Sequence, residues 1–260
     1  MSGSLGGKRA LVTGGDSGIG AAVSLALAVA GADVAIVYNR DEVAAAEVVK
    51  GIEANGAKGL SVQANVAEVG DVDRLFETVA SEWAPLDILV CSAGIDGHAA
   101  LSWEGDPEAW LTVIKVNLFG TYLCARKALA QMVEQKSGVV INISSVHEVI
   151  PWTGFSAYTA SKAGMSMMTK TMAQEAAEHG VRVLAVGPGA IQTPINQNVW
   201  GDPVGLKDLL DKIPFGRMGT PEEIGRLVAV LASDDASYVT GTTVFADGGM
   251  TLFPGFRHGG

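Results

Sequence analysis

Short apolar runs rich in β-branched residues alternate with helix-like segments along the whole chain. Nearly continuous apolar strands are typical of a parallel sheet that helices cover on both faces. The alternation therefore predicts a doubly wound α/β fold, with a parallel sheet of about seven strands flanked by helices. We expect strands at 9–14, 33–38, 59–64, 86–91, 138–143, 181–186 and 242–246, and helices near 18–30, 42–55, 71–83, 107–135, 157–179 and 221–233.

The chain carries no internal repeat and no long linker, so we predict one domain spanning residues 1–260. Residues 192–214 form a loop-rich exception, with several prolines and a short helical piece near 205–212. In this kind of fold, ligands bind outside the carboxyl ends of the strands, where such insertions lie. We interpret the segment as a lid over a substrate site, with a plain surface excursion as the alternative.

Composition excludes several classes of protein. Hydrophobic residues make up 48% of the chain and charged residues 18%, which allows a large core and excludes disorder. The net charge of −10 argues against a nucleic-acid partner, because neutralising phosphates needs clustered Lys and Arg.

Cysteine and histidine spacing points away from metal chemistry. Cys91 and Cys124 lie in apolar surroundings and form no CxxC pair, which indicates buried free thiols in a reducing compartment. His98, His179 and His258 have no partners at ligand spacing, so no metal site is predicted. The sequence shows neither a leader segment nor an apolar run long enough to span a membrane. We therefore expect a cytoplasmic protein with no membrane partner.

A glycine-rich turn follows the first expected strand and opens the first expected helix. Its glycines are spaced G-x-x-x-G-x-G, which lets the backbone approach a phosphate while the helix N-terminus meets the negative charge. In this context the motif predicts a Rossmann-type dinucleotide site. The turn also contains "GDSG", which resembles part of a serine protease, but that fold is all-β and its serine does not open a helix. The turn residues expected at the cofactor are Gly14, Asp16, Ser17, Gly18, Ile19 and Gly20.

The end of the second expected strand should set the choice of cofactor. An acidic residue there binds the ribose 2′-hydroxyl of NAD, whereas a basic residue favours the 2′-phosphate of NADP. Asn39 and Arg40 occupy this place, and Asp41 follows too late to be the ribose acid. Arg40 suits a phosphate, although Asp16 would repel that phosphate mildly. The cofactor is therefore predicted to be NADP or NAD, with NADP slightly favoured and dual use allowed.

Tyr158 and Lys162 lie four residues apart on an expected helix, so they share one face. A phenol with a pKa of about 10 is a poor base at neutral pH. A neighbouring ammonium and an oxidised nicotinamide are therefore expected to lower the pKa of Tyr158. Ser145, at the end of the fifth expected strand, would hold the substrate oxygen against Tyr158.

Ser145 also stands shortly before His147 and Glu148, which together are the residue types of a hydrolase. A nucleophile elbow would read G-x-S-x-G at a strand-to-helix turn, and those glycines are missing around Ser145. We therefore interpret Ser145 as a hydrogen-bonding partner of Tyr158 rather than as a nucleophile.

With these motifs, the chain resembles the short-chain dehydrogenase/reductase family over nearly its full length. Thr13, Gly14, Gly18 and Gly20 match the family pattern T-G-x-x-x-G-x-G, while "CSAG" stands in place of N-N-A-G. We divide the domain into a cofactor half, roughly 8–135, and a catalytic and substrate half, roughly 136–260. The resemblance implies catalytic roles for Asn117, Ser145, Tyr158 and Lys162, with Asn117 holding a water that relays the proton. It implies further cofactor contacts from Asn65, Val66, Ala93, Gly94, Tyr158, Lys162, Pro188, Gly189, Ile191 and Thr193.

Longer stretches are similar to bacterial glucose 1-dehydrogenases within that family, namely "SSVHEVIPW", "GPGAIQTPIN" and "ASYVTGTTVFADGGMT". This similarity implies oxidation of a sugar hydroxyl, from aldose to lactone. The expected substrate residues are Asp96, Ser145, His147, Trp152 and Asn196, with Phe155 completing an apolar wall. For Glu148 we prefer a solvent-facing position over a substrate contact.

Two alternatives to a sugar dehydrogenase stay open. One is a carbonyl or ketone reductase acting on 3-oxoacyl, steroid or small ketone substrates, and the other is a cofactor-binding scaffold without chemistry. The intact catalytic set weighs against the scaffold. The segments 107–135 and 157–179 are more apolar than one buried face requires, which agrees with the homotetramer that the family resemblance implies. Met-rich packing inside a monomer is the alternative.

Overall fold

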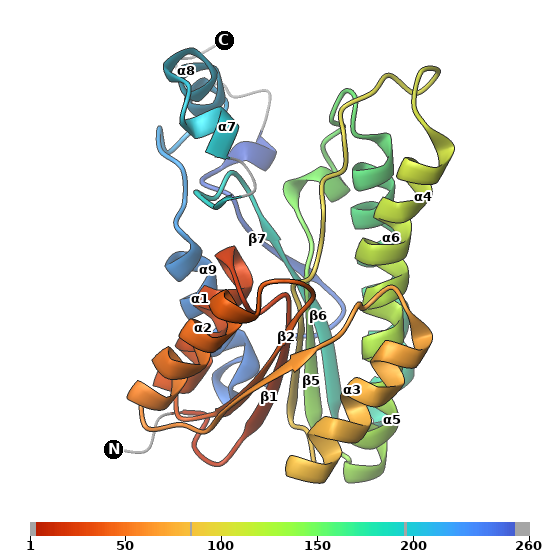
Figure 1. Cartoon of the computed structure of the whole chain (residues 1–260), viewed down its shortest axis with the longest axis vertical. Coiled ribbons are helices and arrows are strands. Elements are labelled where there is room, and N and C mark those ends of the chain that lie inside the picture. The colour runs from red at the N-terminus through yellow and green to blue at the C-terminus, as the bar shows by residue number, and fades with distance from the viewer. Residues whose placement is uncertain (1–3, 84, 195–196, 253–260) are drawn as a thin grey trace.

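The computed structural model describes residues 4–83, 85–194 and 197–252. Within these ranges seven parallel strands form one sheet in the order β3-β2-β1-β4-β5-β6-β7 (Figure 1). This order confirms the predicted doubly wound fold, and strand ends differ from expectation by at most two residues. The strands are β1 (Arg9–Thr13), β2 (Asp33–Tyr38), β3 (Gly59–Gln63), β4 (Ile88–Cys91), β5 (Gly138–Ile143), β6 (Val181–Pro188) and β7 (Thr243–Ala246).

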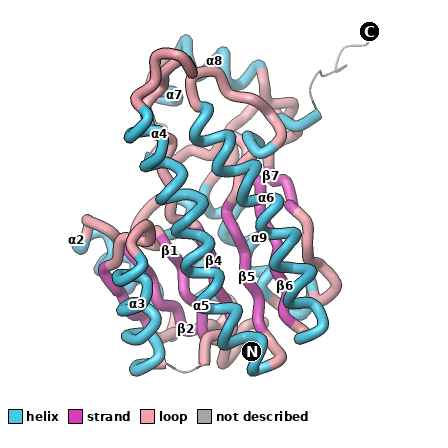
Figure 2. The backbone as a smooth tube through the Cα atoms, turned by 90° about the vertical axis from the view of Figure 1, so that its right-hand side faces the viewer, coloured by secondary structure: helices cyan, strands magenta, loops and turns pink. Residues whose placement is uncertain are grey.

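Helices cover both faces of the sheet, as nearly continuous apolar strands require. Alternate residues of β1 serve opposite faces: Val12 packs in the core beneath α1 and α9, whereas Leu11 packs in the core beneath α3 and α5. Figure 2 shows α3, α5 and α6 lying across this second face. The first face carries α1 (Gly18–Val29), α2 (Glu42–Ala54) and α9 (Pro221–Ala232), and the second carries α3 (Val69–Glu82), α5 (Gly120–Gln135) and α6 (Ser156–Ala176).

The segment expected as one helix at 107–135 contains an irregularity. It runs as α4 (Pro107–Ile114), then a π-helical turn at Lys115–Phe119, then α5. A π turn inserts one residue into the helical ladder, and such turns often occur at functional sites. The side chain at the centre of the turn, Asn117, is fully buried. Periodicity predicted the helix but not this turn, because one extra residue hardly changes the apolar pattern.

Two short helices rise beyond the carboxyl ends of the strands, α7 (Gln197–Trp200) and α8 (Pro203–Asp211) (Figure 1). Asp202 caps α8 by accepting a hydrogen bond from the Gly205 N–H at 2.9 Å. The Trp200 indole donates to the Thr193 carbonyl at 3.1 Å and so ties α7 to the chain that follows β6. The helical piece expected near 205–212 is present, whereas Asn196 lies outside the described residues.

The strand order reverses between β1 and β4, the position at which ligands bind in doubly wound sheets. Thr13 joins the two strand ends, since its hydroxyl oxygen accepts from the N–H groups of Ser92 at 3.1 Å and Ala93 at 3.2 Å. The loop after β4 is thereby held beside the glycine turn after β1. None of the helices in the described part of the chain combines the length and apolar character needed to cross a membrane.

Candidate active site

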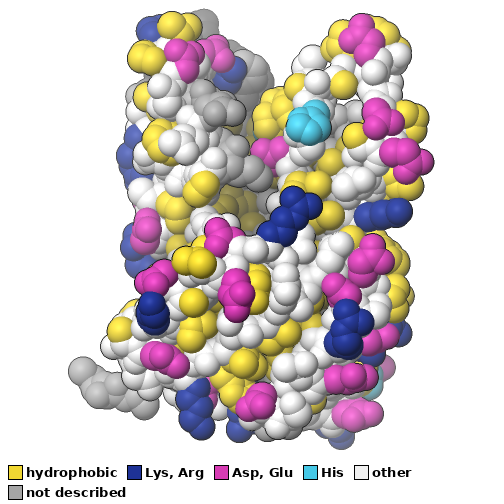
Figure 3. All heavy atoms as spheres, viewed as in Figure 1, with side chains coloured by type: hydrophobic (Ala, Val, Ile, Leu, Met, Phe, Trp, Pro, Cys, Tyr) yellow, Lys and Arg dark blue, Asp and Glu magenta, His cyan; other side chains and the backbone are white. Residues whose placement is uncertain are grey.

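A cleft of about 1660 Å³ opens above the carboxyl ends of the strands. In Figure 3 it appears as the deep hollow at the upper centre, between the lobe of α7 and α8 and the lobe of α4 and α6. Every cofactor residue expected from the sequence lines this cleft, from Gly14 in the glycine turn to Thr193 after β6. The expected substrate residues that line it are Asp96, Ser145, His147 and Trp152.

The glycine turn leaves backbone space where a phosphate would lie. Gly14 and Gly18 have φ values of +62° and +52°, a backbone conformation that residues with a side chain rarely adopt. A Cβ on Gly14 would lie 2.9 Å from the Ala93 Cα. At the start of α1, Ser17 makes no side-chain cap, so the first N–H groups of the helix stay open to an anion. These features fit the pyrophosphate of a dinucleotide.

The ribose end of the cleft is set by the residues after β2. The Asp41 carboxylate caps α2 by accepting from the Ala44 N–H at 2.9 Å, and Asp41 also lines this end of the cleft. Arg40 is exposed, and its guanidinium makes no ion pair with any described side chain. Burial raises the pKa of Asp16, and the nearby Asp41 raises it further. Arg40 is therefore the cation that could attract a 2′-phosphate at this end. Asp16 would repel that phosphate when ionised, but its raised pKa makes it a weaker acid than usual.

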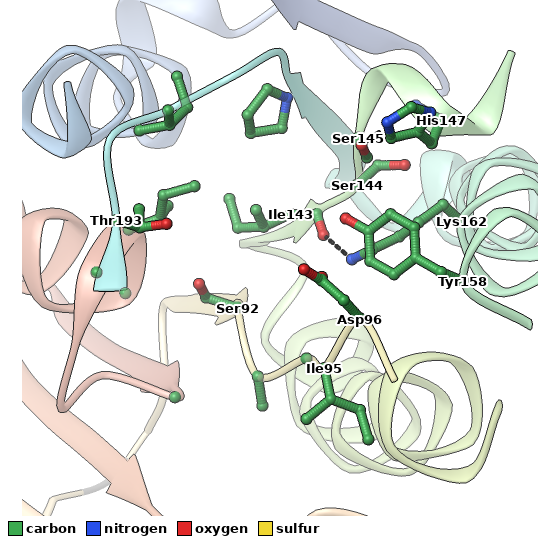
Figure 4. A pocket seen from close by; sticks show the side chains of 18 of the residues that line it. Ser92, Ile95, Asp96, Ile143, Ser144, Ser145, His147, Tyr158, Lys162 and Thr193 are labelled. Atoms are coloured by element: carbon green, nitrogen blue, oxygen red, sulfur yellow. Dashed lines mark hydrogen bonds between the residues drawn. The ribbon is translucent and has the colours of Figure 1, made fainter. Parts of the chain in front are cut away.

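Tyr158 and Lys162 project from α6 into the cleft on one helical face, as their spacing predicts (Figure 4). The Lys162 Nζ donates to the Ile143 carbonyl at 2.8 Å and lies 5.5 Å from the centre of the Tyr158 ring. Burial lowers the pKa of Lys162 to about 8, while the charges of Asp96 and Glu148 act to raise it. The ammonium is thus held in place by β5, and with a pKa of about 8 it begins to lose its proton at mildly alkaline pH.

The phenol of Tyr158 is less acidic in this chain than the sequence suggested. Burial raises its pKa strongly, a hydrogen bond with Ser145 lowers it, and the charge of Asp96 raises it again. Desolvation of a phenolate outweighs the favourable contact with Ser145. The phenol is therefore protonated in the chain alone, and deprotonation needs further positive charge beside it.

Ser145 and Asn117 are held in place by their own hydrogen bonds. The Ser145 oxygen accepts from the His147 N–H at 3.1 Å and caps the 3₁₀ turn Val146–Glu148, and the same hydroxyl makes the hydrogen bond with Tyr158. Asn117 accepts from the Ile95 N–H at 2.8 Å and donates to the Ile95 carbonyl at 2.9 Å and to the Ser161 hydroxyl at 3.2 Å. Asn117 is not among the residues lining the cleft, and its side chain positions the segment that carries Asp96.

Aromatic rings form one wall of the cleft. The His147 ring stacks on Trp152 with 4.6 Å between ring centroids, and both residues line the cleft. Trp152 also stacks on Phe155 at 3.9 Å, but Phe155 is not among the lining residues, so it does not complete the apolar wall as expected. Trp152 also meets the Tyr158 ring edge-on at 5.8 Å. His147 Nδ1 lies 3.0 Å from the Ile150 carbonyl, which can only accept, so Nδ1 carries the proton. Burial lowers the pKa of His147, and the neutral ring keeps Nε2 as a hydrogen-bond acceptor.

Asp96 brings a carboxylate into the same space. Figure 4 shows its oxygens directed into the cleft beside Tyr158 and Lys162. Burial raises the pKa of Asp96, whereas the Lys162 ammonium lowers it, as would His147 when protonated. Among the described residues the carboxylate has no hydrogen-bond donor, so its oxygens stay open to the hydroxyl groups of a ligand.

Comparison with known proteins decides the family. Residues 14–251 match the family profile described as enoyl-(acyl carrier protein) reductase. A 3β-hydroxysteroid dehydrogenase 1 from Eggerthella lenta is 46% identical over 254 residues, which cover 97% of this chain and 97% of that protein. The chain belongs to the short-chain dehydrogenase/reductase family.

Two further relatives of this short-chain dehydrogenase/reductase show how widely substrates vary. Glucose 1-dehydrogenase 2 from Bacillus subtilis is 41% identical over 249 residues, covering 95% of this chain and 96% of the relative. The crystal structure of levodione reductase superposes with a TM-score of 0.92 at 30% identity, covering 96% of this chain and 99% of that one. The protein is thus an oxidoreductase of a family that uses NAD or NADP, and its relatives act on chemically different substrates.

Glu148 is the residue of this short-chain dehydrogenase/reductase whose position the sequence misjudged. Its side chain is half-buried, and the carboxylate accepts hydrogen bonds from the Ser144 and Ser166 hydroxyls instead of pointing freely into solvent. The sequence signal that could have revealed a buried partner is the series of polar residues Ser161, Ser166 and Thr169 on the buried face of α6. A purely apolar core would have no polar residues at these positions. The hydrogen-bond partners of these three residues lie on β5, on the turn after it and on the π-helical turn, so the sequence alone does not show the pairings.

Replacing Asp96 by Asn is expected to move the pH profile of alcohol oxidation toward lower pH. The carboxylate raises the pKa of Tyr158, so a neutral amide lowers that pKa and more phenolate forms at a given pH. The same change removes a charge that supports the Lys162 ammonium, so the alkaline limb moves in the same direction. Initial rates of the wild type and the variant across pH check this. An acidic limb that stays in place or moves to higher pH contradicts it.

Proposed function

We propose that the enzyme oxidises a sugar hydroxyl, converting an aldose to its lactone with NADP or NAD. The observation that carries the proposal is the Asp96 carboxylate, which lies open in the cleft beside Tyr158 and near His147. A polyol needs acceptors for several hydroxyl groups in a small space, and Asp96 and the Nε2 of His147 provide them. The 41% identity to glucose 1-dehydrogenase 2 supports the same substrate class.

The proposed chemistry divides between three side chains. With substrate bound, the Ser145 hydroxyl would donate to the substrate oxygen and hold it against Tyr158. Tyr158 accepts the hydroxyl proton, and the Lys162 ammonium near its ring favours the phenolate. A bound oxidised nicotinamide would accept the hydride and add positive charge to the site. Gly14, Gly20 and the N-terminus of α1 would hold its pyrophosphate.

A second candidate is reduction of a bulky ketone by the same residues. The stacked rings of His147 and Trp152 line the cleft and offer an aromatic face that would suit a fused ring system. The relative at 46% identity is a steroid dehydrogenase, which supports this alternative. In that direction Tyr158 would donate its proton to the forming alkoxide.

Initial rates with a panel of aldoses and ketones, each with both cofactors, separate the two candidates. We expect glucose, galactose or xylose to support reduced-cofactor formation at mildly alkaline pH, with rates above those for steroid or small ketones. Faster turnover of bulky ketones than of every aldose would replace the sugar proposal by the reductase proposal.

Arg40→Asp is expected to shift the cofactor preference toward NAD by at least about tenfold in the ratio of kcat/KM values. The guanidinium is the exposed cation at the ribose end, and an acid there would accept from a 2′-hydroxyl and repel a 2′-phosphate. Arg74→Asp on exposed α3, outside the cleft, is the charge-matched control. An unchanged cofactor ratio in Arg40→Asp would remove Arg40 from the cofactor site.

We also propose that the enzyme is a homotetramer. Large apolar side chains remain exposed on adjacent helices of the second face, including Phe119, Tyr122 and Met167, the last with 61% of its surface exposed. Phe119 and Tyr122 stack on each other at 6.2 Å between ring centroids. Contact with a second copy would bury such a surface. Light scattering in solution would show the mass of four chains; a monomer mass would contradict the proposal.

A further inference from the structure

Glu148 ends the 3₁₀ turn that follows the β5 strand. The turn begins immediately after Ser145 and is closed by the Glu148 N–H, which donates to the Ser145 carbonyl at 3.1 Å. The main chain of Ser144 is itself tied to the sheet, because its N–H donates to the Val186 carbonyl at 2.7 Å. The position of the Ser145 hydroxyl therefore depends on how this turn lies relative to α6.

The Glu148 side chain fixes that relation by bonding in two directions. One carboxylate oxygen accepts from the Ser144 hydroxyl, on the strand side, and the other accepts from the Ser166 hydroxyl of α6 at 3.0 Å. Both serines are buried, with 3% and 8% of their surfaces exposed. The carboxylate itself is half-buried, and hydrogen bonds to a charged oxygen are the stronger kind, so both bonds hold the turn against α6.

Ser166 lies one turn of α6 beyond Lys162, on the same helical face. Lys162 makes a second link to β5 through the Ile143 carbonyl, the residue just before Ser144. Two ties thus join α6 to the chain on the two sides of Ser145, one to Ile143 and one through Glu148. The charge of Glu148 also supports the Lys162 ammonium.

We propose that Glu148 is a positioning residue for the active site, whose carboxylate bridges Ser144 and Ser166 and so sets the distance of Ser145 from Tyr158 and Lys162. The inference rests on the proposed roles of Ser145, Tyr158 and Lys162, but not on which substrate they act on. Glu148 is not assigned any contact with substrate or cofactor.

The test compares Glu148→Ala, Glu148→Gln and Ser166→Ala with the wild type. Gln can still bond both serines, because the serine hydroxyls can accept from its amide as well as donate to it. Glu175→Ala is the matched control, since Glu175 is an exposed glutamate on the same helix. For each protein we would measure kcat and KM with the best substrate of the wild type, cofactor Kd by fluorescence, Tm, and hydrogen exchange of the peptide containing residues 144–150.

Glu148→Ala is expected to lower kcat about 10- to 100-fold with KM and cofactor Kd nearly unchanged, because misplacement of a reacting group acts on the transition state. Ser166→Ala should lower kcat in the same direction by less, and Glu148→Gln should recover most of the loss. The double variant Glu148→Ala/Ser166→Ala should be no slower than Glu148→Ala, since both remove the same bridge. Faster exchange should be confined to the 144–150 peptide.

Unchanged kcat in both Glu148→Ala and Ser166→Ala would overturn the inference. Additive losses in the double variant would overturn it as well, as would a fall in Tm that accounts for the lost activity. Ser166→Ala keeps the comparison informative if Glu148→Ala does not fold. Since any substrate turned over by the wild type serves, a wild type that reduces ketones instead of oxidising sugars refutes the sugar proposal and still tests Glu148.

Discussion

Tyr158→Phe is expected to lower kcat by about 10³-fold while leaving the cofactor Kd nearly unchanged. The substitution removes only the phenolic oxygen, which is the group that exchanges a proton with the substrate. The ring stays in place against Trp152 and His147, so the cleft keeps its shape. Steady-state rates with the best substrate, together with cofactor binding measured by fluorescence, check the prediction.

Tyr122→Phe is the matched control for this prediction. Tyr122 lies on α5 with 41% of its surface exposed and does not line the cleft, so its loss should leave kcat unchanged. A Tyr158→Phe variant that retains more than about a tenth of wild-type kcat would show that another group transfers the proton. Ser145 would then be the first residue to test.

Gly20→Ala is expected to abolish measurable cofactor binding and to lower the free energy of unfolding by roughly 1–3 kcal/mol. A Cβ at this position would lie 2.0 Å from the Gly14 carbonyl oxygen, and both residues belong to rigid backbone. Relief of this clash requires the glycine turn to move away from α1, which opens the cradle for the pyrophosphate. Cofactor titration and chemical denaturation measure the two effects separately.

Gly70→Ala is the control for the same chemical change. Gly70 lies in the first turn of α3, where an added Cβ would meet only the end of the Arg74 side chain at 3.5 Å. Alanine has the higher helix propensity, so stability should stay the same or rise slightly. Equal cofactor affinity in Gly20→Ala and wild type would show that the turn tolerates displacement and that the cradle is not the pyrophosphate site.

Most of the fold was predictable because its signals are local. Strand and helix positions can be predicted from short apolar periodicities, and the glycine turn can be predicted from a motif of seven consecutive residues, 14–20. The spacing of Tyr158 and Lys162 is likewise a property of a single helix. Each of these features is complete within a few neighbouring residues, so no knowledge of the folded chain is needed to find it.

The parts that could not be predicted depend on partners that are distant in sequence. Glu148 pairs with Ser166 on α6, and Asn117 pairs with Ile95 after β4. The raised pKa of Tyr158 is also a tertiary property, since it results from burial. Spacing along the chain shows which residues are chemically suitable, but only the packing of distant segments against one another shows which of them meet.

The polar contacts of α6 with the β5 segment and with the π-helical turn at Lys115–Phe119 have a consequence for engineering this enzyme. Thr169 accepts from the Asn142 amide at 2.9 Å, Ser166 donates to Glu148, and Ser161 accepts from Asn117. An apolar seam would tolerate a shift of one helical turn, about 5.4 Å, whereas these pairs would all be broken by it. These hydrogen bonds therefore fix the position of α6 along the sheet. Repacking this seam with larger apolar residues to gain heat resistance would therefore remove the alignment of Tyr158 and Lys162, and thermostabilising changes belong on other surfaces.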